Sequence, residues 1–209
     1  MQKIPSLFKR DYDGNRLVIP EVVEGCEWVL TGEGVATVKW DGTCCMVRDG
    51  RLYKRYDRKP TKAARRKGGP YLMTADFKPA PDEWEPCEPM PNKHTGHWPG
   101  WLPVGEGPED QWHREAWDAN YGFVDDGTYE LIGPKVQGNL YGLQDHNLVL
   151  HGNMPIVWSG SWYIGSTAVM YDAIKHELEL LQHEGIVWHH DDGRMCKIKR
   201  KDFGLAWPI

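Results

Sequence analysis

The pattern of hydrophobic and polar positions predicts a series of short strands. Across residues 35–56 the alternation of apolar and polar side chains is broken at Asp41-Gly42 and at Asp49-Gly50, both of which favour tight turns. A three-stranded meander is therefore expected, with strands at 35–40, 43–48 and 51–56. The same alternation predicts strands further along the chain, at residues 127–132, 147–150 and 155–158.

One helix and a closing hairpin are predicted in the last quarter of the chain. Four apolar residues recur at helical spacing and form a stripe that we interpret as core: Met170, Ile174, Leu178 and Leu181. The helix is expected to be capped by Ser166 and to run to about Gln182. Residues 185–189 and 195–200 are then expected to pair around the turn Asp191-Asp192-Gly193.

Between residues 58 and 118 the apolar residues follow neither the spacing of a helix nor the alternation of a strand for any length. A basic run gives way to a stretch rich in Pro, Trp, Gly and acidic residues, which predicts a long, partly ordered insertion. Its tryptophans either stack on unpaired bases or pack a small core of the insertion, and we favour the second use: Trp84, Trp98, Trp101 and Trp112. The fold class expected from all these elements is α+β, with antiparallel sheets packed together and helices outside.

The composition narrows the possible classes of protein. With 209 residues and 40% hydrophobic residues, the chain fits one globular domain over residues 1–209. A net charge of -5 excludes a simple basic coat for nucleic acid. Without an apolar signal segment or a stretch of about 20 apolar residues, the protein is expected to be soluble, cytoplasmic and free of the membrane. Five cysteines, two of them adjacent, favour reduced and mostly buried thiols.

Two lysines on the last predicted strand are the first candidates for chemistry. Lys197 and Lys199 share one face of that strand, while Cys196 and Ile198 share the other. Two ammonium groups over a buried backing are suited to gripping phosphate oxygens, and with a bound metal they favour the neutral, nucleophilic form of a third lysine, Lys39. The alternative is a solvated charged edge that discourages pairing with another strand.

The order of the motifs identifies a resemblance. Val38-Lys39-Trp40-Asp41-Gly42 is followed by Thr43-Cys44-Cys45, by the run from Arg55 to Pro60, and at long range by Glu184-Gly185-Ile186-Val187 and Lys197-Ile198-Lys199. From about residue 30 to residue 205, apart from much of the Pro/Trp-rich stretch, the chain resembles the single-domain 5′-3′ RNA ligases of the vertebrate type and their microbial and viral relatives. More broadly it resembles the lysyl-adenylate superfamily, which also includes DNA ligases and capping enzymes.

The resemblance implies a nucleotidyltransferase fold, an ATP-grasp-like ligase adenylation domain, and a covalent mechanism. Lys39 would attack the α-phosphate of ATP and become lysyl-AMP, the AMP would move to an RNA 5′-phosphate, and an RNA 3′-hydroxyl would seal the strand. Lys197 and Lys199 would assist as catalytic and nucleotide-binding residues. Mg²⁺ is the implied metal, for which Mn²⁺ is able to substitute, and the enzyme is expected to be monomeric and to act in RNA repair.

Two further residues are implied to bind the nucleotide. Arg55 would hold the nucleotide and the incoming 5′-phosphate; the alternative is a surface arginine in a hairpin. Glu130, in Tyr129-Glu130-Leu131-Ile132-Gly133, would accept hydrogen bonds from the ribose hydroxyls. A structural ion pair of Glu130 with Lys135 or Arg55 is the other possibility.

Glu184 is implied to lie near the ribose and the magnesium ion, because Mg²⁺ prefers hard oxygen ligands. Alternatively, Glu184 is a solvated carboxylate beyond the end of the helix. The residue that stacks on adenine is left open between His151 and a tryptophan such as Trp158.

The densest basic run directly follows the predicted nucleophile hairpin. We predict that it contacts RNA phosphates, through Arg55, Arg58, Lys59, Lys62, Arg65 and Arg66. The alternative is an ordinary solvated surface. A group of possible zinc ligands within the insertion matches the spacing of no common zinc site: Cys87, His94, His97 and His113.

Two other functions are compatible with parts of this pattern. DNA ligases and capping enzymes usually append an oligonucleotide-binding domain after the last lysine motif. Only ten residues follow Lys199, so no such C-terminal domain is expected. A nonenzymatic RNA-binding protein that retains the fold is the remaining alternative, and it predicts RNA binding that survives loss of Lys39.

Overall fold

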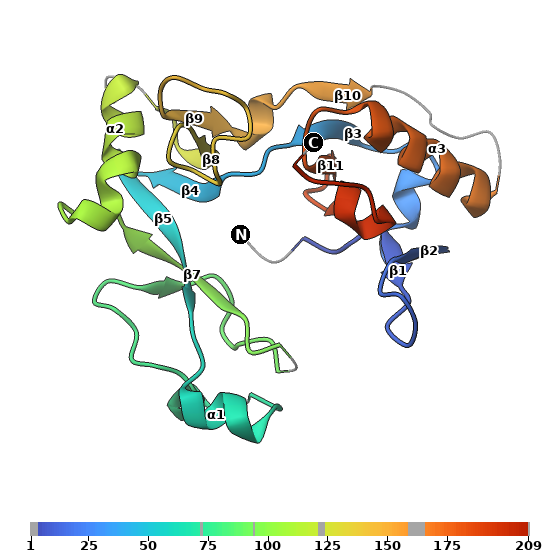
Figure 1. Cartoon of the computed structure of the whole chain (residues 1–209). Coiled ribbons are helices and arrows are strands. Elements are labelled where there is room, and N and C mark those ends of the chain that lie inside the picture. Colours follow the sequence, from blue (N-terminus) through green and yellow to red (C-terminus); the bar gives the residue numbers. More distant parts are fainter. Residues whose placement is uncertain (1–3, 72, 94, 121–123, 159–165, 209) are drawn as a thin grey trace. The chain divides into compact units, whose positions relative to one another are not determined.

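A computed structural model describes residues 4–71, 73–93, 95–120, 124–158 and 166–208 of the chain (Figure 1). The chain divides into two compact units. The four-stranded unit consists of residues 3–41 and 153–209, and the six-stranded unit is formed mainly by residues 42–152. Each unit has its own sheet and its own core, and each is described by itself.

The four-stranded unit contains an antiparallel sheet in the order β10-β3-β11-β12. Its strands are β3 (Val35–Lys39), β10 (Ile156–Trp158), β11 (Gly185–His189) and β12 (Met195–Lys199). A separate pair, β1 (Phe8–Arg10) and β2 (Val18–Val22), was not predicted. Helix α3 (Thr167–Leu180) and two short 3-10 helices, η1 (Glu27–Val29) and η5 (Arg200–Phe203), complete the unit. The predicted strands in this unit are therefore confirmed to within a residue or two.

The core of this unit forms where α3 and the sheet bury their apolar side chains. The predicted stripe is confirmed, because Met170, Ile174 and Leu178 are buried in one cluster with the inward-facing residues of β3, β11 and β12. Leu181, just beyond the helix, packs against the same cluster. Ser166 is the N-cap residue, but its side chain makes no capping hydrogen bond.

The outer edge of β12 is paired with the beginning of the described chain. The amide of Lys197 donates to the carbonyl oxygen of Pro5 at 2.9 Å, and the amide of Leu7 donates to the carbonyl oxygen of Lys197 at 2.8 Å. The edge at Lys197 is therefore covered. Protection of an open strand edge does not explain the lysines at this position.

The six-stranded unit contains an antiparallel sheet in the order β6-β7-β5-β4-β8-β9. Four of its strands match the prediction closely: β4 (Thr43–Arg48), β5 (Arg51–Arg58), β8 (Gly127–Ile132) and β9 (Asn147–Leu150). Strand β5 extends two residues further than predicted. The turn between β4 and β5 contains Asp49 and Gly50, both at positive φ, as expected from the Asp-Gly pair.

Regular structure within residues 58–118 was underestimated. The structure contains α1 (Lys62–Lys67), β6 (Glu85–Pro86), β7 (Trp98–Pro103), α2 (Gln111–Ala119) and two 3-10 turns, η2 (Thr74–Asp76) and η3 (Pro108–Asp110). Strand β7 pairs along its whole length with β5. Its two prolines argue against a strand, but β7 lies next to the two-residue strand β6 at the end of the sheet, where the missing donors are tolerated.

The tryptophans of this segment mostly build a core, as favoured above. Trp98 is buried in a cluster with Ala64, Tyr71 and Phe77, and Trp84 packs against it. The rings of Trp84 and Trp98 meet edge to face, with centroids 5.4 Å apart. Trp101 is also buried, whereas Trp112 stacks on the ring of His146.

The expectation of reduced, mostly buried thiols finds support. All five cysteines are free thiols, and Cys26, Cys45 and Cys196 are buried. Within the ranges that the structure describes, no helix is long and apolar enough to cross a membrane.

Candidate functional site

Strand register places Lys39 and Lys199 on either side of a glycine. Gly185, the first residue of β11, is opposite Lys39 of β3 and also opposite Lys199 of β12. Residues in direct register share a face of the sheet, so both lysines project from the same face. A Cβ atom on Gly185 would lie 2.1 Å from the carbonyl oxygen of Ile198, which explains why this position has no side chain.

The carboxylate of Glu184 joins the two lysines. Lys39 Nζ donates to Glu184 Oε2, and Lys199 Nζ donates to Glu184 Oε1. Glu184 is only 2% exposed, whereas the side chains of Lys39 and Lys199 are 20% and 25% exposed. We call this group the lysine triad. It is a buried anion between two cations that reach solvent, so the alternative of a solvated carboxylate is wrong.

The charges of the lysine triad depend on one another. Burial by itself raises the pKa of Glu184, but the ammonium groups of Lys39 and Lys199 more than offset this, and the pKa falls below its usual value. Glu184 is therefore ionised at neutral pH. With two cations and one anion, the triad has a net positive charge, which suits a polyphosphate ligand.

Neighbouring contacts hold the segment that follows Lys39. Lys39 Nζ also donates to the carbonyl oxygen of Trp40 at 3.3 Å. The ring of Trp40 meets that of His183 edge to face at 4.8 Å. The indole nitrogen of Trp207 donates to Asp41 Oδ2 at 2.8 Å, so the carboxylate of Asp41 ties the segment after β3 to the C-terminal residues.

Lys197 lies beside the lysine triad. Lys197 and Lys199 occupy alternate positions of β12 and are both half-buried, whereas Cys196 and Ile198 are fully buried on the other face. The predicted division of β12 into a charged face and a core face is therefore confirmed. Lys197 is opposite Val187, which lies two residues along β11 from Gly185, the residue opposite Lys199.

In the six-stranded unit, Glu130 of β8 is held by two donors. The amide of Gly42 donates to Glu130 Oε1 at 3.0 Å, and His151 Nε2 lies 3.0 Å from Glu130 Oε2. The other ring nitrogen of His151 lies 2.9 Å from Thr128 Oγ1. The ionic partner found for Glu130 among the described residues is the imidazole of His151. The side chain of Trp158, the other adenine-stacking candidate, lies outside the described part of the structure.

Cys44 joins Glu130 and His151 in a compact group. Cys44 is opposite Glu130 in the β4–β8 pairing, and one ligand atom from each of the three side chains lies within 4.8 Å of the others. Burial, together with the negative charge of Glu130, raises the pKa of the Cys44 thiol to about 12. Sequence reasoning missed this group, because its members meet only through strand register.

Arg55 is held in place on β5. Its Nε lies 3.4 Å from Asp57 Oδ1, and its guanidinium lies over the ring of Trp101 at 5.6 Å. Only 18% of the Arg55 side chain is exposed, so the alternative of a free surface arginine does not fit. His97 Nε2 lies 2.8 Å from the other carboxylate oxygen of Asp57, a contact that the sequence did not indicate.

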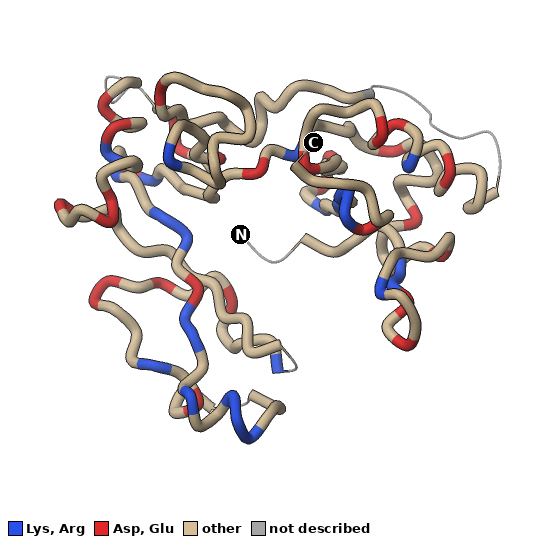
Figure 2. The backbone as a smooth tube through the Cα atoms, in the orientation of Figure 1, with Lys and Arg blue, Asp and Glu red and all other residues tan. Residues whose placement is uncertain are grey.

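The predicted RNA-binding residues fall into two kinds. Arg58 serves the local core, because its guanidinium lies 4.8 Å from the centre of the Trp98 ring and its Nε donates to the carbonyl oxygen of Lys78. Lys59, Lys62, Arg65 and Arg66 are exposed instead, and Figure 2 shows the basic residues gathered along α1. We call these four residues, with Lys67, the basic segment.

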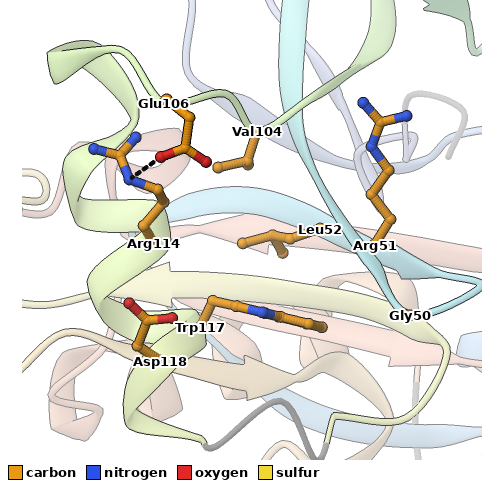
Figure 3. Close-up of a pocket in the computed structure, with 8 residues that line it drawn as sticks. All are labelled: Gly50, Arg51, Leu52, Val104, Glu106, Arg114, Trp117 and Asp118. Atoms are coloured by element: carbon orange, nitrogen blue, oxygen red, sulfur yellow. Dashed lines mark ion pairs between the residues drawn. The ribbon is translucent and has the colours of Figure 1, made fainter.

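Two pockets of about 250 Å³ each lie in the six-stranded unit. One adjoins the basic segment and is lined by Asp57, Arg58, Lys59, Pro60, Arg65, Tyr71, Thr95, Gly96 and His97. The other lies at α2, where Arg114 pairs with Glu106 at 3.8 Å (Figure 3). None of the eight residues that line the second pocket is a predicted site residue.

Comparison with known proteins gives the family. The chain is 32% identical over 277 residues to RNA ligase 1 of Danio rerio, a match that covers all of this chain and 82% of that protein. It is also 32% identical over 232 residues to RNA ligase 1 of Mus musculus, covering 84% of this chain and 68% of the mouse protein. The chain belongs to the RNA ligase 1 family. A family model described as RNA ligase 1 also matches residues 120–209.

The match to RNA ligase 1 covers the residues that form the site. The segment matched by the family model contains Glu130, Glu184, Lys197 and Lys199, and the alignment to the Danio rerio protein also spans Lys39. The resemblance stated from the sequence motifs is therefore confirmed at the level of the family. The roles of the individual residues in this RNA ligase 1 family member stay predictions.

Proposed function

We propose that the protein is an ATP-dependent RNA ligase that joins 5′-phosphate and 3′-hydroxyl ends through a lysyl-AMP intermediate. The observation that carries this proposal is the lysine triad, which fixes the candidate nucleophile Lys39 beside a buried carboxylate and a second cation. The family membership supports RNA as the substrate, because the relatives bear the name RNA ligase 1.

In the first step, the neutral amine of Lys39 attacks the α-phosphorus of ATP. A nitrogen–phosphorus bond forms while the bond to the pyrophosphate oxygen breaks, and the attacking nitrogen releases one proton to solvent. Lys199 and Lys197 neutralise negative charge on the phosphates, a contribution that depends on their fixed positions on β12. The pyrophosphate leaves, and AMP remains attached to Lys39 as a phosphoramidate.

In the second step, an oxygen of the RNA 5′-phosphate attacks the same phosphorus. The nitrogen–phosphorus bond breaks, Lys39 recovers its amine, and the RNA end becomes an adenylate. In the third step, an RNA 3′-hydroxyl attacks the activated 5′-phosphate, loses its proton and displaces AMP. Each step is an in-line displacement that requires alignment and charge neutralisation more than a strong base.

The donor set at the lysine triad fits the metal that the family implies. Glu184 offers hard carboxylate oxygens, the kind of ligand that Mg²⁺ prefers, between two lysine side chains that reach solvent. When bound, Mg²⁺ would neutralise charge on the phosphates of ATP. The ammonium groups of Lys39 and Lys199 hold the carboxylate in the same place, which orients it toward the substrate.

The residues of the six-stranded unit keep their predicted roles in this proposal. Glu130 accepts hydrogen bonds from the ribose hydroxyls, and Arg55 holds phosphate. The exposed residues of the basic segment contact the RNA backbone, whereas Arg58 supports the aromatic cluster below them. The antiparallel α+β architecture is compatible with the nucleotidyltransferase fold, which we propose for the chain.

Transfer of label from ATP to the protein tests the covalent step. Wild type and Lys39→Ala, freed of bound AMP with pyrophosphate, are incubated with α-labelled ATP or GTP and Mg²⁺ and resolved on a denaturing gel. We expect label from ATP in wild type only. Lys54→Ala is the matched control, because Lys54 is another largely buried lysine paired with a carboxylate, Asp110. Label that persists in Lys39→Ala contradicts the proposal, and label from GTP favours capping chemistry.

The nucleic acid is tested separately. End-labelled RNA and DNA of the same sequence are offered as a nicked duplex, a broken loop and two free ends. We expect sealing of RNA with a 5′-phosphate and a 3′-hydroxyl, and accumulation of adenylylated RNA when the 3′-hydroxyl is absent. Sealing of DNA alone would overturn the choice of RNA.

A further inference from the structure

The sheet of the six-stranded unit brings together three metal-ligating side chains that are far apart in the sequence. Cys44 on β4 lies directly opposite Glu130 on β8, so their side chains project from the same face. Strand β9 pairs with β8 on the other side, with Leu150 opposite Tyr129, and His151 follows immediately. The turn of η4 (His151–Asn153) returns the imidazole to Glu130.

The geometry of this group suits a single cation. Its three ligand atoms lie within 4.8 Å of one another, and His151 Nε2 lies 3.0 Å from Glu130 Oε2. Ligands about 2.0–2.3 Å from a tetrahedral zinc ion lie roughly 3.5 Å apart, so small side-chain rotations complete the site. All three residues are half-buried, which limits access of water.

Neighbouring groups orient two of the three ligands. His151 Nδ1 lies 2.9 Å from the hydroxyl of Thr128, which leaves Nε2 directed at the group. The amide of Gly42 donates to Glu130 Oε1 and leaves Oε2 for the same position. Such outer contacts fix the orientation of ligands in metal sites.

Two other histidine–carboxylate pairs among the described residues lack a third ligand. His97 with Asp57 and His146 with Glu115 are each within 2.9 Å, yet neither is part of a cluster of three metal-ligating side chains. Across the ranges described above, Cys44, Glu130 and His151 form the single such cluster. The thiol therefore distinguishes this group from ordinary structural pairs.

We propose that Cys44, Glu130 and His151 bind one thiophilic divalent cation of the Zn²⁺ class. Thiolate and imidazole ligands select such an ion over Mg²⁺, and three protein ligands leave a fourth position for water or another oxygen. On binding, the Cys44 thiol releases its proton to solvent and a sulfur–metal bond forms, with no redox change. The ring proton of neutral His151 moves to Nδ1, where it is donated to Thr128 Oγ1, so that Nε2 coordinates the ion. Binding of this ion goes beyond the proposed ligase activity, and the site shares no residue with the lysine triad. Glu130 is also the carboxylate that the proposed function assigns to the ribose, so a bound ion and the nucleotide compete for it.

The test measures metal binding in the full chain without ATP or RNA. Protein stripped with a chelator is titrated with Zn²⁺ against a chromophoric competitor, and with Co²⁺ to detect a thiolate-to-metal charge-transfer band. We expect one equivalent of Zn²⁺ and a Co²⁺ band in wild type. Cys44→Ser should lose the band and weaken Zn²⁺ binding at least about 100-fold, since even outer-contact changes cost 10- to 100-fold. His151→Gln should weaken binding similarly.

Matched controls separate this site from other thiols and histidines. Cys87→Ser removes the other half-buried cysteine, and His97→Asn breaks a histidine–carboxylate pair without a thiol. Both should bind metal as wild type does. Lys39→Ala should also keep the ion, so failure of the ligase proposal leaves this result unchanged. Absence of stoichiometric binding in wild type, or equal binding by Cys44→Ser and wild type, would overturn the inference.

Discussion

The lysine triad and the basic segment use similar side chains in opposite ways. In the triad, Lys39 and Lys199 converge on one buried carboxylate and stand on strands backed by core. The basic segment presents exposed lysines and arginines on and next to α1, and no ion pair is found for them among the described residues. The triad holds its charges in fixed positions, as transfer of AMP to Lys39 requires. The basic segment instead offers exposed charges to the flexible backbone of an RNA.

Removing the proposed nucleophile should give the largest effect, because AMP transfer at the triad should be lost while RNA binding by the basic segment is kept. We expect Lys39→Ala to lose transfer of AMP to the protein completely, since no other lysine shares its position. RNA binding by the basic segment should be retained. Lys39→Arg serves as a charge-preserving control and should be equally inactive. Residual label in either variant, measured on the denaturing gel, would move the covalent bond elsewhere.

Removing the shared anion should damage both stability and activity. Glu184→Gln leaves two ammonium groups without their carboxylate, which we expect to lower the free energy of unfolding by about 3 kcal/mol. Urea denaturation measures this loss, and the labelling assay measures the accompanying fall in activity. Glu179→Gln, on the exposed side of α3, should change neither. A stability equal to that of wild type would mean that the triad contributes little to the fold.

The cations beside Lys39 should have intermediate effects. Lys199→Ala should slow lysine adenylylation about 100-fold, the cost of losing one fixed donor at a developing charge. Lys197→Ala should slow lysine adenylylation less, because Lys197 lies two residues along β12 from Lys199 and is opposite Val187 instead of Gly185. The exposed Lys201→Ala is the control. Single-turnover labelling rates that are unchanged in both strand variants would remove Lys197 and Lys199 from the mechanism.

Reversing charge in the basic segment should act on RNA alone. With Lys62, Arg65 and Arg66 changed to Glu, RNA affinity should fall at least about tenfold and the salt dependence should become shallower by about 2 in log–log slope. Labelling of Lys39 by ATP should stay at the wild-type rate. The matched control reverses Lys9 and Lys201 in the four-stranded unit. An unchanged salt slope would exclude the segment from the RNA interface.

Lowering the pH should give the smallest of the expected effects, a change in how much Glu184 contributes to the stability of the fold. Because the folded-state pKa of Glu184 is lowered, its stabilising contribution is complete above the unfolded-state value of about 4.3 and disappears as pH falls through the lower folded value. The stability difference between wild type and Glu184→Gln should therefore be constant above about pH 5 and shrink in stronger acid. Unfolding free energies measured between pH 3 and pH 7 check this. A difference that shrinks above pH 5 would contradict the direction of the shift.

The sequence predicted the elements whose patterns are local. Alternation and Asp-Gly turns located β4, β5 and β11, and the resemblance named Lys39, Glu184 and Lys199. Strand β7 was missed because its prolines contradict the usual strand pattern, and its pairing with β5 depends on position within the sheet.

Contacts across the sheets could not be predicted in the same way. Glu130 meets His151 and Cys44 only because β8 lies between β4 and β9 in a particular register. Arg58 is not one of the exposed cations, because its guanidinium lies over aromatic rings that are distant in the sequence: Phe77, Trp84 and Trp98. Periodicity describes one segment at a time and contains no information about such neighbours.

The long separation between Lys39 and its carboxylate has a consequence during protein synthesis. Glu184 lies 145 residues after Lys39, and the strand that bears Lys199 is completed by pairing with residues 5–7. A nascent chain therefore displays Lys39 long before the triad can assemble, since contacts this distant form late in folding. Incomplete translation products that stop before residue 184 should neither consume ATP nor trap AMP, so competence arises only when distant segments have met.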